Sequence, residues 1–190
     1  NNGTVLKVSA AGIVNGSDEV GGLVGKINET TAEVETSYSE VSVGASGDGV
    51  GGLVGVNENG SVLDTYAVGS VSGNASIGGL VGVNNGSVTD SYWNEDEVGS
   101  DVSGAGTNLS TSEMQGATAA TNMGGLDFVS TWNTVSGDYP KFVWQAKATA
   151  PSCSVVSYSG GGTESNPYKI GNVDQLQCVK EDLEAVYELT

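Results

Sequence analysis

The sequence predicts an all-β fold, a β-helix or β-solenoid, from two observations. A glycine-centred segment recurs along the chain, as VGGLVG at 20–25 and 50–55 and as IGGLVG at 77–82. Between the copies lie short runs of Val, Thr and Tyr, which favour strands, separated by Asn-Gly and Gly-Asn turns. Internal periods of about 20 to 50 residues are typical of solenoids and other repeat architectures.

Each repeat has the length expected for one coil of the solenoid. The first glycines stand at Gly21, Gly51 and Gly78, so the spacings are 30 and 27 residues and a coil takes about 28. Every copy divides at its glycines into three short apolar pieces, which predicts three strands per coil. We expect right-handed coils stacked about 4.8 Å apart. A β-sandwich of similar hairpins is the alternative, but the close identity of the copies favours stacking.

Stacking of like coils should align equivalent side chains into ladders. We expect two such ladders in the core, formed by Leu23, Leu53 and Leu80 and by Tyr38, Tyr66 and Tyr92. Asn57 and Asn84 are expected to form a hydrogen-bonded amide ladder at a turn. In the first coil, Val8 is expected to take the place of the tyrosine. These regular positions indicate core packing rather than a binding site.

Composition excludes several classes of function. The chain has 23 acidic and 6 basic residues, a net charge of −17 and no histidine. Histidine-activated nucleophiles and histidine-bearing metal sites are therefore excluded, and we expect neither a cofactor nor catalysis. The negative charge repels nucleic acid and anionic lipid. The longest apolar runs fall well short of the roughly 18 residues of a membrane span, so we expect no membrane insertion.

The repeat resembles a known family. The pattern GGLVG-x-N-x-G-x-V-x-x-[ST]-Y is similar to the GLUG repeat of large bacterial and archaeal surface proteins. Residues 91–115 and 126–145 resemble the segment that closes GLUG arrays, and residues 160–190 resemble the opening of a further array. The resemblance implies an extracellular β-helix on a prokaryotic cell surface, often in adhesins. It supplies no catalytic residues.

The chain divides into four predicted segments. Residues 1–93 are the repeats, 94–146 a loop followed by a closing unit, 147–162 a linker, and 163–190 the opening segment of a further array. Five large side chains of the closing unit are expected to cover the last coil: Met114, Phe128, Trp132, Tyr139 and Trp144. A short C-terminal helix is expected over 173–186, with Asn172 as its N-cap, because its apolar residues recur at three- and four-residue steps.

The only two cysteines, Cys153 and Cys178, stand 25 residues apart. In the extracellular setting that the resemblance implies, we expect them to form a disulfide between the linker and the helix. Such a loop would stabilise the fold by roughly 3 kcal/mol in the chain-entropy model. Two buried free thiols are the alternative.

Asn-Xaa-Ser/Thr sequons, the acceptor sequence for N-linked glycans, are frequent in the chain. Seven of its 15 asparagines lie in one: Asn2, Asn15, Asn28, Asn59, Asn74, Asn85 and Asn108. An extracellular protein is expected to carry glycans at several such positions. Turn formation alone is an equally good explanation, because Asn-Gly-Ser makes a good turn without any sugar.

A cluster of carboxylates follows the repeats and is a candidate for calcium binding. Glu95, Asp96, Glu97 and Asp101 lie in one predicted loop, and oxygen-rich loops can hold Ca²⁺. The cluster does not match an EF-hand, and a solvated acidic surface is the stronger interpretation.

The sequence leaves three hypotheses about function. The first is a non-enzymatic extracellular subunit or stalk that joins copies of itself, or flanking repeats, head to tail in a cell-surface filament. An open β-helix end invites such pairing, and the chain begins midway through one array and ends where the β-helix of a second is expected to begin. The second is a segment of a large adhesin that binds surface glycans through exposed tryptophans. A polysaccharide-active enzyme is the remote third.

Overall fold

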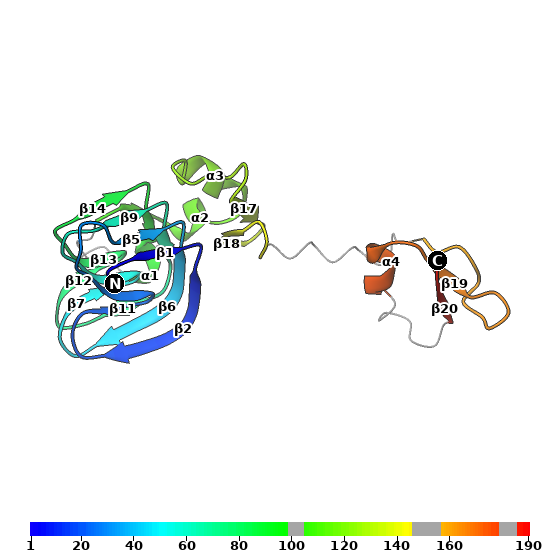
Figure 1. The fold of residues 1–190 in the computed structure, drawn as a ribbon, viewed down its shortest axis with the longest axis horizontal. Coiled ribbons are helices and arrows are strands. Elements are labelled where there is room, and N and C mark those ends of the chain that lie inside the picture. Colours follow the sequence, from blue (N-terminus) through cyan, green and yellow to red (C-terminus); the bar gives the residue numbers. More distant parts are fainter. Residues whose placement is uncertain (99–104, 146–156, 179–185) are drawn as a thin grey trace. The chain divides into compact units, whose positions relative to one another are not determined.

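The computed structural model describes residues 1–98, 105–145, 157–178 and 186–190. It divides into two compact units, Asn1–Val143 and Trp144–Thr190 (Figure 1). The first is a β-solenoid of about three stacked coils and the second is a small strand-and-helix unit. Among the described helices, none combines the length and the apolar character that a membrane span requires.

Four parallel sheets form the walls of the solenoid. Sheet A contains β1 (Thr4–Leu6), β5 (Glu33–Glu35), β9 (Ser61–Leu63) and β14 (Ser87–Thr89). Sheet B contains β2 (Ser9–Gly16), β6 (Tyr38–Ala45), β10 (Tyr66–Ala67), β11 (Val71–Ser72), β15 (Tyr92–Asn94) and β16 (Thr107–Leu109). Sheet C contains β3 (Val20–Gly21), β7 (Asp48–Gly51) and β12 (Ala75–Gly78). Sheet D contains β4 (Val24–Ile27), β8 (Val54–Asn57) and β13 (Val81–Asn84).

The solenoid fold is as predicted, but each coil has four walls rather than three strands. The segment that looked like one strand around each GGLVG motif is two strands, because a corner at the glycine pair separates sheet C from sheet D. Strands pair in register along the repeat, so that Val34 lies beside Val62, and Val54 beside Val81. Buried aliphatic side chains fill the interior between the walls.

The leucines of the motif lie in one column. The amide of Leu23 donates to the carbonyl of Leu53, and the amide of Leu53 to that of Leu80, both at 2.9 Å. Leu53 and Leu80 are fully buried, while Leu23, in the first coil, is half-buried at the edge of the core. The leucines therefore face the interior and become less covered toward the open first coil.

The tyrosines also lie in register, but they face outward. Tyr66 pairs with both Tyr38 and Tyr92, and the Tyr38 and Tyr66 rings stack with centroids 4.9 Å apart. Ala67, the next residue, lies in the interior core while Tyr66 lies in a separate cluster outside the wall. Successive side chains of a strand point to opposite faces, which explains the separation. In the first coil the tyrosine position belongs to Ser9, so its assignment to Val8 was wrong by one residue.

The closing unit covers the outer face of sheet B rather than the end of the last coil. It contains α2 (Thr111–Met114), the 3-10 turn η1 (Gly116–Thr118), α3 (Ala119–Asn122), β17 (Trp132–Val135) and β18 (Asp138–Phe142). The Trp132 ring lies 5.8 Å from that of Tyr38 and 5.5 Å from that of Tyr66. The end of the last coil is covered instead by Trp93, which packs into the interior core.

The described residues after position 93 form a helix and a strand where a loop was predicted. It contains α1 (Glu95–Val98) and, after the described chain resumes, β16, which pairs with β15. Asn94 fixes this region, because its amide donates to the Thr111 hydroxyl at 2.9 Å and to the Tyr139 hydroxyl at 2.6 Å. A buried amide thus ties the last coil to the closing unit.

The second unit pairs β19 (Tyr168–Ile170) in parallel with β20 (Tyr187–Leu189) and contains α4 (Val173–Cys178). Asn172 caps α4 as predicted, accepting a hydrogen bond from the Gln175 amide at 2.9 Å. The predicted helix was too long, because Val186 is not helical. Residues 179–185, and most of the predicted linker, lie outside the described residues.

One corner of the solenoid carries a column of residues in the left-handed backbone region. Between sheets A and B, four non-glycine residues have positive φ: Lys7 (55°), Thr36 (47°), Asp64 (53°) and Asp90 (46°). Asp tolerates this conformation better than most residues. The column also brings carboxylates together: burial, and then the negative charges of Asp90, Glu35 and Asp127, raise the pKa of Asp64 above its usual value.

Asp64→Asn is expected to stabilise the protein at neutral pH by about 0.5 kcal/mol, the scale of partly exposed charge pairs. The folded-state pKa of Asp64 is raised, so its ionised form opposes folding at neutral pH. This unfavourable contribution disappears as the pH falls through the folded pKa toward 3.8, and the advantage of the variant should disappear with it. Urea unfolding at pH 7 and pH 3 measures the difference. Glu29→Gln, which removes an exposed carboxylate, should show no comparable gain.

Candidate functional site

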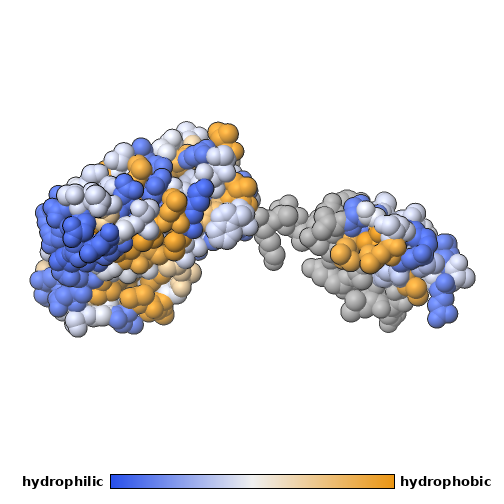
Figure 2. All heavy atoms as spheres, viewed as in Figure 1, coloured by the Kyte–Doolittle hydropathy of each residue, from blue (hydrophilic) through white to orange (hydrophobic). Residues whose placement is uncertain are grey.

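The first coil that the structure describes has unpaired strand edges, and it is called the open first coil below. Its strands β1, β2, β3 and β4 each pair with a neighbour on one side only, within the part of the chain that the structure describes. Apolar side chains are exposed there: Ile13 is 77% and Leu6 49% accessible. Figure 2 shows apolar surface over this side of the first unit. A free strand edge with exposed apolar residues is a site for pairing with another strand.

The last coil is blocked in one of its four walls, while β14, β12 and β13 keep an unpaired edge among the described strands. In sheet B, β16 already occupies the position next to β15. Trp93, only 5% exposed, fills the end of the interior, and a Cβ on Gly79 would come within 2.1 Å of its ring. The two ends of the solenoid therefore differ, because the first coil has free edges in all four walls while the last is blocked in sheet B.

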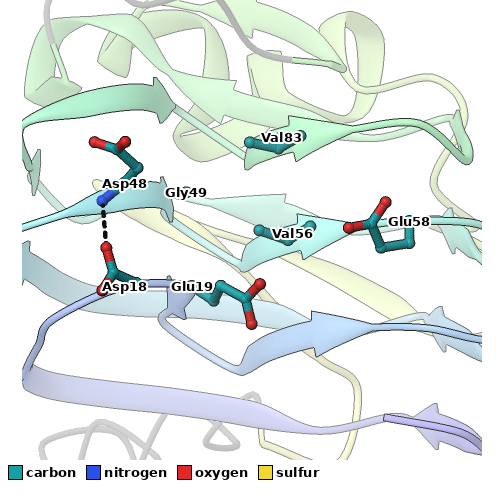
Figure 3. Close-up of a pocket in the computed structure, with 7 residues that line it drawn as sticks. All are labelled: Asp18, Glu19, Asp48, Gly49, Val56, Glu58 and Val83. Carbon is teal, nitrogen blue, oxygen red and sulfur yellow. Dashed lines mark hydrogen bonds between the residues drawn. The ribbon is translucent and has the colours of Figure 1, made fainter.

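An acidic groove lies on the outer surface where sheets C and D meet (Figure 3). It has a volume of about 290 Å³ and is lined by Asp18, Glu19, Asp48, Gly49, Val56, Glu58 and Val83. The Asp18 carboxylate accepts a hydrogen bond from the Asp48 amide at 3.0 Å. Two valines form its apolar part and four carboxylates its polar part, so the groove favours groups with positive charge.

Lys26 partly neutralises this groove. Its ammonium lies 2.7 Å from Glu19 and 3.3 Å from Glu58. Hydrogen bonds to these carboxylates raise the pKa of Lys26, and the Asn85 amide together with Lys26 lowers that of Glu58. The sequence analysis missed the groove. One feature of the sequence could have indicated it. When the repeats are aligned, Lys26 takes the position that Val56 and Val83 take in the later copies, so a charged residue replaces an apolar one in sheet D.

The four carboxylates considered as calcium candidates are not gathered into a metal site in the described residues. Glu95, Asp96 and Glu97 form the short helix α1, and Asp101 lies outside the described residues. The Asp96 carboxylate accepts a hydrogen bond from the Thr111 amide at 2.8 Å, and that of Glu95 accepts one from the Asn108 amide. Within the described ranges, groups of three or more acidic or sulfur ligands suited to a metal ion are absent. The carboxylates of Glu95 and Asp96 are therefore engaged in hydrogen bonds with other residues of the chain.

All seven sequon asparagines are exposed. The buried asparagines, Asn57 and Asn94, are outside sequons, and the Asn57 amide donates to the side chain of Asn84 at 2.9 Å. All seven predicted acceptor asparagines are therefore accessible, and glycosylation at them stays a prediction.

Tryptophans and cysteines complete the predicted candidates. Trp132 is 1% and Trp93 5% exposed, whereas Trp144 is 70% exposed, so only one tryptophan offers a face to a ligand. Cys178 is buried at the end of α4. Cys153 lies outside the described residues, so the Cys153–Cys178 disulfide stays a prediction.

Comparison with known proteins links this architecture to long surface-type proteins. No protein-family model and no solved structure matches the chain. It is 35% identical over 124 residues to a protein named Gly-rich membrane protein from Evansella cellulosilytica, covering 60% of this chain and 14% of that protein. It is 42% identical over 176 residues to Halomucin from Haloquadratum walsbyi, covering 90% of this chain and 2% of that protein. The chain therefore spans a small part of each, and both names point to surface-associated rather than enzymatic relatives.

Proposed function

We propose that the chain is a non-enzymatic structural segment of a prokaryotic cell-surface protein, of the GLUG-repeat type, that joins copies of itself head to tail. The open first coil is the observation that carries this proposal. It presents free edges in four sheets and exposed apolar side chains, including Ile13. The names of the similar proteins support a location in the cell envelope and a structural role.

The partner for the open coil is the second unit of another copy. The last coil of a neighbour is a poor partner, because β16 occupies the position in sheet B that β2 would need. The second unit offers β20, which pairs in parallel with β19 and leaves its other edge free among the described strands. Leu189 and Leu176 are exposed there and could pack against the apolar residues of the first coil. Because the two joining surfaces differ, repeated joining would build a filament.

Ile13→Lys is expected to weaken this assembly. A charge on an exposed edge strand opposes pairing, and losing about 1.4 kcal/mol of joining free energy raises the concentration needed for assembly about tenfold. Electron microscopy and hydrodynamic mass, measured on the whole chain over a concentration series, test this.

The matched control is Val129→Lys, which places the same charge at a 96% exposed position of the closing unit. It should assemble like the unaltered chain. A chain that stays monomeric at every concentration, or equal assembly of both variants, would contradict head-to-tail joining. The chain would then be better described as one span of a longer surface adhesin.

A further inference from the structure

We infer that the chain is N-glycosylated at the corner between sheets B and C, with Asn15 as its principal site. The inference rests on the proposed extracellular location but is independent of assembly. In this modification, a transferase uses a lipid-linked oligosaccharide phosphate as donor. The bond between sugar C1 and the phosphate oxygen breaks, C1 bonds to the asparagine Nδ2, which loses a proton, and the lipid phosphate leaves.

The asparagines inside sequons are exposed more often than the asparagines outside them. All seven are exposed, compared with four of the eight remaining asparagines: Asn84, Asn133, Asn166 and Asn172. The rest are buried or half-buried, and Asn57 and Asn94 use their side chains within the fold. Every asparagine that carries the acceptor sequence can thus be reached by an enzyme outside the protein.

The sequons are concentrated at two corners of the solenoid. Four of them precede strands of sheet A in successive coils: Asn2, Asn28, Asn59 and Asn85. Neighbours in this column touch, since the Asn28 amide lies 3.5 Å from the Asn2 side chain and the Asn59 amide 3.0 Å from the Asn28 carbonyl. Coils are about 4.8 Å apart, so a bulky glycan on one of these positions obstructs the next.

The corner between sheets B and C has wider spacing. Asn15, at the end of β2, and Asn74 lie near it in the first and third coils, and the coil between them places Gly44 beside Asn15 and Gly47 beside Asn74, neither of them in a sequon. Backbone hydrogen bonds follow this order, from Gly47 to the Ser17 carbonyl and from Asn74 to the Gly47 carbonyl. Two coils, or about 10 Å, separate the two asparagines, which leaves room for a glycan on each.

Asn15 is also the sequon that a transferase can most easily engage. It projects from sheet B beside Gly44, a neighbour without a side chain. Its sequon runs from the end of β2, which pairs only with β6 among the described strands, into the exposed bend at Ser17. Moving it away from the wall therefore breaks pairing with one described strand. Asn59 is the opposite case, because Ser61 of its sequon lies in β9, which is paired with β5 and β14.

Glycopeptide mass spectrometry of the whole chain, isolated from the cell that makes it, tests this inference. We expect a hexose-containing mass on the Asn15 peptide at several times the occupancy of the Asn59 peptide. In that cell, Asn15→Gln and Ser17→Ala should each remove this glycan, while Asn59→Gln and Asn133→Gln leave the glycan on the Asn15 peptide unchanged. A bare Asn15 peptide, or occupancy at Asn59 equal to that at Asn15, overturns it. Assembly is measured separately, so failure here leaves head-to-tail joining intact.

Discussion

Gly51→Ala is expected to cost on the order of 4 kcal/mol of folding free energy, enough to leave much of the chain unfolded. Gly51 is the first glycine of the second GGLVG motif, at the corner between sheets C and D. A Cβ there would lie 1.9 Å from the carbonyl oxygen of Val54 and 2.7 Å from the amide nitrogen of Gly82. Both are backbone atoms of paired strands, so neither can move aside without breaking the coil. Urea unfolding followed by circular dichroism measures the loss.

Gly3→Ala is the matched control for this substitution. A Cβ at Gly3 meets nothing within 4 Å, and its φ is not among the positive ones. A glycine-to-alanine change at a compatible position is neutral or stabilising by up to about 1 kcal/mol. If Gly51→Ala and Gly3→Ala unfold at the same urea concentration, the corner does not have the close backbone approach described here.

Trp132→Ala is expected to destabilise the protein by about 3–5 kcal/mol, the usual cost of removing a buried aromatic side chain. Trp132 is 1% exposed and lies between the closing unit and sheet B. Its ring contacts those of Tyr38, Tyr66 and Phe142, with the Phe142 centroid 4.5 Å away. Loss of this ring should release the closing unit first, because the interior core of the solenoid does not include it.

Limited proteolysis with mass spectrometry would detect the release of the closing unit. Cleavage of Trp132→Ala should begin within residues 111–142, before the stacked coils are cut. Trp144→Ala, which alters a tryptophan that is 70% exposed, should change neither the unfolding midpoint nor the cleavage pattern appreciably. Simultaneous cleavage throughout the first unit would show that the closing unit and the coils unfold together.

Most of the solenoid could be predicted from the repeat itself. Identical motifs stack in register, because each coil must offer the next one the same backbone and side-chain surface. This logic placed Gly21, Gly51 and Gly78 in one column, as the strand pairing has them. The same reasoning gave the wrong number of walls. The glycine pair at the corner between sheets C and D adds no change in hydropathy, so the two short strands beside it look like one.

The candidate sites were harder to predict, because they depend on which face of a strand is covered. The exposed sequons and the open first coil follow from turn residues and from the phase of the repeat. The acidic groove does not, since Asp18 and Asp48 come from successive coils and meet only through stacking, while Glu58 joins them across the corner between sheets C and D. The carboxylates of α1 had the opposite outcome: adjacent in sequence, they turn to different hydrogen-bond partners.

The sequence by itself determined the period, the solenoid fold and the register of the repeated motifs, since these depend on local turn chemistry and on the likeness of successive copies. Only the tertiary structure decided that the tyrosines face outward. Tyr66 and Ala67 are both apolar enough for either face, so two-residue alternation does not choose between them. The choice depends on the closing unit, which returns from residues 107–143 to cover the rings. The Tyr66 hydroxyl donates to the Pro140 carbonyl, a contact between residues 74 positions apart that no local pattern encodes.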